Sequence, residues 1–316
     1  MSELPGDARE ILVRGTLCHL AAPSPAGPHV TPVVFVLDGD RLWGTTGRGT
    51  TKARRWRRDA RAAGLVRAGD RWVTFRGPVT TYDLLDPSRW SDSLRRIPQL
   101  TRASARYTLK NARFFAGYAR DAPRVPLAWT PPARVLFSVD LEAGAVLREG
   151  RAAERWGRWG RRTETSSDYR AARSGLPNGG LPREVRELLA ERGQGTIGLE
   201  GRVGPVVLPA AWVRSGGTFL AVLPRPLLAL SAARGEGRAS LVVDHASTWR
   251  AAEMRGALVR GMADAFVPGG LRAGARSLAG AIRDAAETIP DPAVVRLRAR
   301  TVVWWEGWSS GTVGRS

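Results

Sequence analysis

A glycine- and threonine-rich stretch, Gly47–Thr51, carries the residue types of this chain that are best suited to bind an anion. It follows an apolar segment of β-strand composition, Arg41–Thr46, and it ends at Lys52. Glycine lets backbone N–H groups approach a phosphate closely, threonine adds hydroxyl donors, and lysine adds positive charge. Lys52 is one of only two lysines among 49 basic residues, the other being Lys110. The stretch therefore predicts a phosphate site, although a polar turn at the edge of a sheet has a similar composition.

A predicted β-hairpin places this stretch at the end of a strand. An apolar run, Val30–Leu37, leads to the turn Asp38-Gly39-Asp40, and the second strand, Arg41–Thr46, follows it. Asp-Gly between two apolar runs is a strong hairpin signal, because the central residues of such turns must accept positive φ. Periodicity and capping predict the neighbouring elements, a helix at Asp7–Arg14, a strand at Thr16–Ala22, a helix at Ala53–Ala63 and a hairpin at Gly64–Thr81.

The second half of the chain repeats the first. Aligned without gaps, residues 27–44 and 204–221 share six identities at an offset of 177. Upstream, Gly15-Thr16-Leu17 aligns with Gly195-Thr196-Ile197 at an offset of 180, and downstream Arg76-Gly77 aligns with Arg255-Gly256 at 179. The matches come in the same order and in the same predicted context, so we interpret them as a tandem duplication.

The segment Leu17–Gly77 resembles the pyridoxamine 5′-phosphate oxidase-like superfamily of FMN-binding split barrels, which includes deazaflavin (F420)-dependent reductases and haem-handling relatives. The resemblance rests on Pro28-His29-Val30-Thr31-Pro32, the Asp-Gly turn, Thr45-Thr46 and Lys52. It implies a mainly β fold with helices, in which two tandem split β-barrels form an intrachain pseudo-dimer with a cofactor in the groove between them. The expected domains are a first barrel at 1–150 with a helical insert at 87–120, an Arg/Gly/Ser-rich linker at 151–181, and a degenerate second barrel at 182–316.

The same resemblance implies which residues bind the cofactor. Thr46 and Lys52 fall on the positions that contact phosphate in the family, with threonines and arginines around them as supporting donors. A short part of the preceding strand would run along the isoalloxazine edge of the cofactor. The expected cofactor-binding residues are Pro32, Val33, Val34, Thr45, Thr46, Arg48, Thr51, Lys52, Arg54 and Arg55.

Two departures from the family pattern limit what it implies. The oxidase proper carries basic residues on the strand equivalent to Val30–Phe35, whereas most residues there are apolar in this chain. This difference argues against pyridoxamine phosphate oxidase activity itself. In the second copy, Val222, Leu223 and Ala229 stand where the first copy has its two threonines and its lysine. At most one family-type cofactor site per chain is therefore expected.

Three classes of function stay open. The first is a flavin- or deazaflavin-dependent oxidoreductase that passes hydride or electrons through FMN or F420 to an unknown small molecule. In such an enzyme the cofactor carries the chemistry, so no catalytic side chain is assigned. The second class is a non-catalytic protein that binds FMN, F420 or haem. The third is a pair of barrels that has lost its cofactor and serves in interactions.

Composition narrows the expected partners. A single cysteine, Cys18, excludes an intrachain disulfide, and three scattered histidines make a metal centre unexpected. No apolar run is long enough to cross a membrane and no signal peptide is apparent, so a cytoplasmic protein without a membrane partner is expected. The net charge of +20 attracts anions in general, but the arginine-rich stretch Arg148–Arg173 has no nucleic-acid motif. We expect a small-molecule substrate, no specific nucleic acid, and a monomeric pseudo-dimer, with a further homodimer left open.

Overall fold

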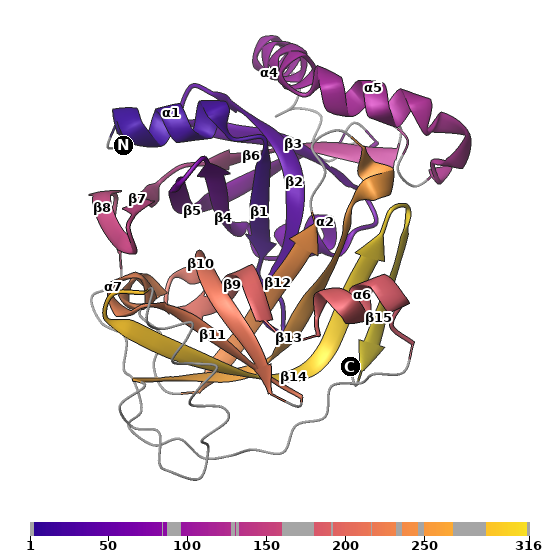
Figure 1. Ribbon diagram of the computed structural model, residues 1–316. Coiled ribbons are helices and arrows are strands. Elements are labelled where there is room, and N and C mark those ends of the chain that lie inside the picture. Colours follow the sequence, from indigo (N-terminus) through magenta and orange to yellow (C-terminus); the bar gives the residue numbers. More distant parts are fainter. Residues whose placement is uncertain are drawn as a thin grey trace.

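The structure, a computed structural model, consists of two β-barrels with helices around them (Figure 1). The N-terminal barrel lies above the C-terminal barrel in this view, and α2 lies on the side of the first barrel that faces the second. The fold is mainly β, as the sequence predicted. The structure describes residues 3–83, 85–86, 96–127, 130, 133–159, 180–190, 192–215, 217–231, 236–245, 250–267 and 289–314.

Six antiparallel strands close the first barrel in the order β1-β2-β3-β6-β5-β4, and β4 pairs back with β1. The strand β5 bends at Gly77 and exchanges its partner there, pairing with β7 before the bend and with β6 after it. The hairpin β7–β8 then extends the sheet beyond the barrel. The strands are β1 (Leu17–Ala22), β2 (His29–Asp38), β3 (Arg41–Gly47), β4 (Arg61–Ala68), β5 (Arg71–Tyr82), β6 (Arg134–Asp140), β7 (Ala143–Arg148) and β8 (Arg151–Trp156).

The domain boundaries stay predictions. Strand β8 lies within the stretch 151–181 that the sequence suggested as a linker, and residues 160–179 of that stretch lie outside the described residues. In the predicted insert at 87–120, the described part forms two consecutive helices, while residues 87–95 lie outside the described residues. The helices of the first half are α1 (Gly6–Arg14), α2 (Thr51–Trp56), α4 (Ile97–Lys110), α5 (Ala112–Arg120) and a 3-10 turn at Ala122–Arg124.

The helix predicted at Ala53–Ala63 is wrong in its second half. The helix α2 ends at Trp56, and the chain enters β4 at Arg61. Ala62 and Ala63 are fully buried in that strand. Alanine favours helix intrinsically, but a strand that closes a barrel buries small residues well, and tertiary packing overrides propensity.

The second barrel has the same strand order, β9-β10-β11-β14-β13-β12, and closes through β12 and β9. The helix suggested by the sequence at 272–288 lies outside the described residues. The strands are β9 (Arg192–Gly201), β10 (Gly204–Ser215), β11 (Thr218–Pro224), β12 (Gly237–His245), β13 (Arg255–Phe266), β14 (Pro292–Glu306) and β15 (Ser309–Gly314). The helices are α6 (Arg183–Leu188), α7 (Arg225–Leu228) and 3-10 turns at Ala229–Ser231 and Ala251–Glu253.

Strand register confirms the tandem duplication and corrects one of its offsets. His19 of β1 lies opposite Pro32 of β2, and Thr196 of β9 lies opposite Pro209 of β10. The offset of 177 therefore holds for the first strand of each barrel as well as for the hairpin that follows. Thr196 corresponds to His19, and its predicted pairing with Thr16 is wrong.

A glycine in close contact with backbone atoms shows that the downstream offset of the repeat also needs correction. A Cβ on Gly77 would lie 1.7 Å from the carbonyl oxygen of Asp140, and a Cβ on Gly261 would lie 1.8 Å from that of Arg298. Any side chain at either position would collide with backbone, so both barrels need glycine there. The counterpart of Gly77 is thus Gly261, and its predicted pairing with Gly256 is wrong.

The two barrels pack directly on each other. The hydroxyl of Thr74 in β5 donates a 2.7 Å hydrogen bond to the carbonyl oxygen of Val207 in β10. Leu65 and Leu147 of the first barrel belong to the hydrophobic cluster that fills the second. His19 Nδ1 lies 2.6 Å from Thr196 Oγ1. Since these two residues occupy equivalent positions, the contact lies on the approximate two-fold axis that relates the barrels.

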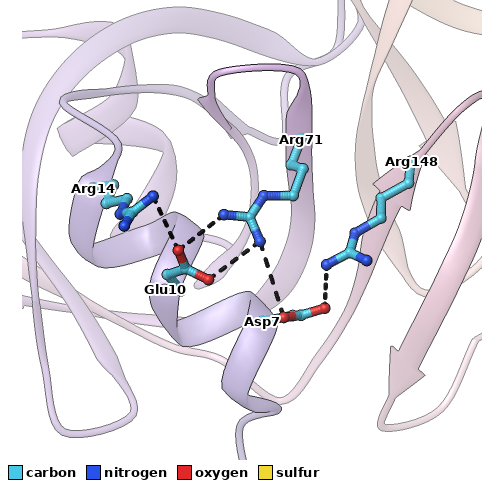
Figure 2. A network of polar contacts seen from close by, with 5 residues as sticks. All are labelled: Asp7, Glu10, Arg14, Arg71 and Arg148. Carbon is cyan, nitrogen blue, oxygen red and sulfur yellow. Dashed lines mark hydrogen bonds and ion pairs between the residues drawn. The ribbon is translucent and has the colours of Figure 1, made fainter.

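A network of charged side chains connects α1 to the first barrel (Figure 2). The carboxylate of Glu10 accepts two hydrogen bonds from Arg71, at 3.0 and 3.2 Å, and lies 3.1 Å from Arg14. Asp7, in the first turn of α1, pairs with Arg148 at the end of β7. The apolar side of α1 is buried against the barrel, so the charged network mainly orients a helix that hydrophobic contact already places.

Candidate functional site

The two threonines at the end of β3 point to opposite sides of the strand. Thr45 Oγ1 accepts hydrogen bonds from Arg134, at 3.0 Å from Nε and 2.8 Å from Nη2, and lies 3.1 Å from the hydroxyl of Tyr107 in α4. Thr46 is buried, and its Oγ1 lies 3.0 Å from Thr50 Oγ1. Successive side chains of a strand alternate between its faces. Thr45 is thus engaged with the helical insert, and only Thr46 faces the glycine-rich loop.

The glycine-rich loop is closed by its own hydrogen bonds. Thr50 Oγ1 donates to the carbonyl oxygen of Gly47 at 2.7 Å and accepts from the backbone N–H of Ala53 at 3.4 Å. This is the geometry of an N-cap, in which a threonine side chain satisfies a free amide of the first helical turn. The cap begins α2 at Thr51 and so places Lys52 in its first turn.

Lys52 is buried and has no acidic partner among the described residues. Its ammonium group donates to the carbonyl oxygen of Thr31 at 3.0 Å. Burial lowers the pKa of Lys52 to about 7, because the charged form loses its hydration. The neighbouring thiol of Cys18 supplies no negative charge, since burial raises its pKa to about 12.

The other expected arginines differ in how their charge is used. Arg48 pairs with the buried carboxylate of Asp83 at 2.7 Å, and Arg57 lies 3.9 Å from the same carboxylate. This pairing compensates the charge of Arg48 locally. Arg54 is exposed to solvent, whereas Arg55 is half-buried and has no acidic partner within the described part of the chain.

Three cations act on the pKa of His29, and together with it they form a basic cluster that we define as His29, Lys52, Arg55 and Arg260. Burial, followed by the charges of Lys52, Arg260 and Arg55, lowers the pKa of His29 to about 3. Burial and then the charge of Arg55 lower the pKa of Arg260. No carboxylate pairs with any member of the cluster among the residues that the structure describes. His29 Nδ1 is buried there without a hydrogen-bond partner.

Sequence reasoning missed two members of this cluster. It named His29 only as part of the Pro28–Pro32 motif, and it attached no function to Arg260. A signal for Arg260 did exist, because it precedes Gly261 as Arg76 precedes Gly77 in the first copy. The incorrect downstream offset concealed that correspondence.

The three residues of β2 that were expected to bind the cofactor also lie in different surroundings. Pro32 and Val33 are half-buried and directly follow Thr31, whose carbonyl oxygen holds Lys52. Val34 is instead buried in the hydrophobic cluster beneath α4. Val33 packs against the core of the first barrel. Of the expected residues, the structure therefore places Pro32 next to the carbonyl group that Lys52 contacts, with Arg55 on the same helix as Lys52.

Comparison with known proteins shows a family resemblance in the first barrel. A family model described as pyridoxamine 5′-phosphate oxidase matches residues 5–114. No curated protein sequence matches the chain. The expected resemblance is thus confirmed for the part of the first barrel that the family model matches. The strand order of the second half repeats that barrel.

Several solved structures are similar to about half of the chain. A pyridoxamine 5′-phosphate oxidase-related, FMN-binding protein from Nostoc punctiforme is 20% identical, with 46% of this chain and 85% of that chain covered and a TM-score of 0.34. An FAD-binding protein from Mesorhizobium loti is 17% identical, with 45% and 94% covered and a TM-score of 0.33. An F420 reductase is 23% identical, with 45% and 98% covered and a TM-score of 0.30.

The described residues also lack two other kinds of feature. They contain no group of three or more His, Cys, Asp or Glu side chains placed to hold a metal ion. None of their helices has the length and apolar character needed to cross a membrane.

Proposed function

We propose that the chain binds one phosphate-bearing redox cofactor, FMN or F420, at the basic cluster and acts as an oxidoreductase on a small molecule. The observation that carries the proposal is Lys52, a buried cation without an acidic partner among the described residues, in the barrel that matches the family. Burying an uncompensated charge is unfavourable. A bound phosphate would supply the missing negative charge.

The residues present fit such a group. Lys52 and Arg55 of α2 would hold the phosphate, with Thr51 and Arg54 beside them on the same helix as further donors. Thr46 and Arg48 would keep the loop in place through Thr50 and Asp83 rather than bind the ligand themselves.

The ring end of the cofactor is proposed to lie along β2. Pro32 and Val33 are half-buried and lie next to the carbonyl group that holds Lys52. They would present backbone groups and an apolar surface to a planar ring. The cofactor itself would supply hydride or electron transfer, and the chain would bind it, orient it and exclude water.

A titration of FMN and of F420 into the purified protein tests this proposal. We expect one equivalent of one of the two cofactors to bind, and Lys52→Met to weaken that binding about 10- to 100-fold, because one charge-assisted contact is lost. Lys110→Met is the matched control. Lys110 is the other lysine, and it donates to the carbonyl oxygen of Leu12 at 3.1 Å, away from the basic cluster.

The outcomes separate the three classes of function. Binding together with reduction of the cofactor and turnover of an artificial electron acceptor supports the enzyme. Binding without turnover of any acceptor supports a non-catalytic carrier. If neither cofactor binds, the proposal is wrong and a barrel pair without a cofactor is favoured. Equal affinities of wild type and Lys52→Met would remove Lys52 from the site.

A further inference from the structure

A chain of three polar side chains crosses the junction of the two barrels. His19 of β1 lies between Thr196 of β9 and Asp244 of β12, with Nδ1 2.6 Å from Thr196 Oγ1 and Nε2 3.2 Å from Asp244 Oδ2. A hydroxyl group, an imidazole and a carboxylate in this order have the chemistry of a nucleophilic triad. Thr196 is only 1% exposed, so its hydroxyl group is not accessible to a substrate. The chain is therefore suited to hold a proton and a charge rather than to attack a ligand.

The same contacts can hold His19 in either protonation state. A carboxylate only accepts hydrogen bonds, so Nε2–H donates to an ionised Asp244 in both states. Nδ1 accepts from the hydroxyl group of Thr196 in the neutral imidazole and donates to it in the imidazolium, because a hydroxyl group can do both. A proton can therefore bind to His19 and leave it without a change in the packing of the barrels.

Apolar surroundings give the charge of this chain a strong effect. The side chain of Asp244 is 8% exposed and that of His19 is 19% exposed. The residues directly opposite His19 and Thr196 on the neighbouring strands are all apolar, and they are Pro32, Leu65, Pro209 and Val242. A carboxylate buried in such surroundings needs a positive charge beside it. His19 is placed to supply that charge.

Asp244 is the only titratable group that contacts His19 in the described part of the chain. Cys18 and His29 project from the other face of their strands, because successive side chains alternate. The charged side chains of the elements around β1 have contacts elsewhere, namely Lys52 of α2 with Thr31, Arg61 of β4 with Asp59, Arg214 of β10 with Leu189, and Arg238 of β12 with Glu200 of β9.

The other side of the approximate two-fold axis has no such pair. Thr196 corresponds to His19, and the same strand register makes Arg67 of β4 the counterpart of Asp244. The guanidinium group of Arg67 lies 5.0 Å over the ring of Trp72 and makes no hydrogen bond to Thr196. The imidazole–carboxylate pair is thus present on one side of the axis only.

The imidazole lies beside the part of β2 where the cofactor ring is proposed to bind. His19 and Pro32 are directly opposed in the antiparallel pair β1–β2. Such residues project from the same face, with Cβ atoms about 4.5–5.5 Å apart. A charge that appears on a ring lying along Pro32 would act on the His19–Asp244 pair through apolar surroundings, in which electrostatic interactions are strong.

We propose that His19 compensates charge at the ring end of the site, by taking up one proton when the bound ring becomes negative and releasing it when the ring is neutral again. The inference rests on the proposed function, because it needs a redox cofactor along β2. Two-electron reduction adds two electrons and one proton from the solvent to the ring and so leaves one negative charge on it. A second proton from the solvent binds Nδ1 of His19 and balances that charge. Asp244 holds the imidazolium, and Thr196 changes from hydrogen-bond donor to acceptor.

The pH dependence of the midpoint potential of the bound cofactor counts these protons. FMN is the first probe, F420 is used if FMN does not bind, and an electrode supplies the electrons through a viologen mediator. Each proton taken up with two electrons lowers the potential by about 30 mV per pH unit. We expect wild type to take up one proton more than His19→Gln, so its slope is steeper by about 30 mV per pH unit within the range from about pH 5 to 8 in which histidine titrates.

Two further variants complete the comparison. His245→Gln is the matched control, because this second histidine of β12 is exposed and follows Asp244 directly in the sequence. It should keep the slope of wild type. Asp244→Asn should lose the extra proton as His19→Gln does, because the imidazolium would be buried without a negative charge beside it.

The outcomes separate this inference from the proposed function. Equal slopes in wild type and His19→Gln, or an equal loss in His245→Gln, overturn the inference and leave the cofactor function standing. Loss of the extra proton in His19→Gln, together with a bound cofactor that reduces no acceptor, supports the inference and overturns the enzyme. If neither FMN nor F420 binds wild type, both are overturned. If His19→Gln does not fold, Asp244→Asn decides, and a wild-type slope in that variant overturns the inference.

Discussion

At the scale of single residues, the two lysines show how strongly burial decides what a charged group can do. Lys52 is buried and Lys110 is half-buried, and both donate to a backbone carbonyl instead of a carboxylate. Burial lowers the pKa of Lys52 to about 7 and that of Lys110 to about 8. Only Lys52 adjoins other uncompensated cations, so the two residues provide a natural comparison between a ligand site and a structural position.

The low pKa of Lys52 predicts that the ligand-free protein becomes more stable as pH rises from 7 to 9. The pKa of Lys52 lies near 7 in the folded protein and its ordinary value is 10.5, so the unfolded state binds more protons throughout this interval and stability increases with pH. The penalty is complete below pH 7 and is relieved on passing above it. We expect a gain of about 2 kcal/mol from Lys52 in the free energy of unfolding.

Urea denaturation at pH 7, 8 and 9 measures this effect. Lys52→Met should lose most of the increase, and Lys110→Met should lose a smaller part, because its pKa is depressed less. The interval ends at pH 9 because the raised pKa of Cys18 opposes the trend above that point. A slope in Lys52→Met as steep as in wild type would contradict the assignment.

At the scale of elements, the helical insert is attached to both barrels. Asp38, at the end of β2, has a buried carboxylate that pairs with Arg102 at 2.9 Å and Arg106 at 2.6 Å, both on α4. Beyond α5, Asp121 pairs with Arg250 of the second barrel at 2.5 Å. The helices α4 and α5, with the turn that follows them, therefore span the junction of the two barrels.

Asp38→Asn is predicted to loosen α4 without unfolding the barrels. Two arginines lose their anionic partner and a buried amide replaces a carboxylate, so we expect a cost of about 1–3 kcal/mol. Hydrogen exchange should accelerate in residues 97–110 and remain slow in the barrel strands. Asp40→Asn is the control, because its pair with Arg9 at 2.6 Å is largely exposed and worth about 0–1 kcal/mol. Equal effects of the two variants would contradict a special role for Asp38.

At the scale of the whole molecule, the hydrophobic core of the second barrel extends into the first. Residues of β4 and β7 in the first barrel belong to the hydrophobic cluster of the second, and equivalent positions meet at the His19–Thr196 contact. A duplicated chain that buries part of its first copy in the core of its second copy has little reason to unfold in two steps.

We therefore predict a single cooperative unfolding transition. Differential scanning calorimetry should show one peak whose calorimetric and van't Hoff enthalpies agree. Thr74→Val, which removes the hydrogen bond to Val207, should lower the stability of both barrels together by about 1 kcal/mol. Two resolved transitions, or a Thr74→Val effect confined to one of them, would show that the barrels unfold independently.

The sequence by itself determined the fold class, the family resemblance of the first barrel, the duplication and the place of Lys52 at the end of the glycine- and threonine-rich stretch. These features depend on local signals: a turn that needs positive φ, alternation along strands, and spacing within one hairpin. The offset of 177 residues could be recognised in the sequence because paired strands must keep the same spacing between their residues in both copies.

Only the tertiary structure decided which of the expected residues share a site. It separated Thr45 from Thr46, because β3 has one face under α4 and the other toward the loop. It buried Lys52 and brought Arg260, more than 200 residues away in the chain, to the same cluster. Such contacts arise when two sheets pack face to face. The faces that meet depend on closure and register of whole barrels, which no local pattern of residues encodes.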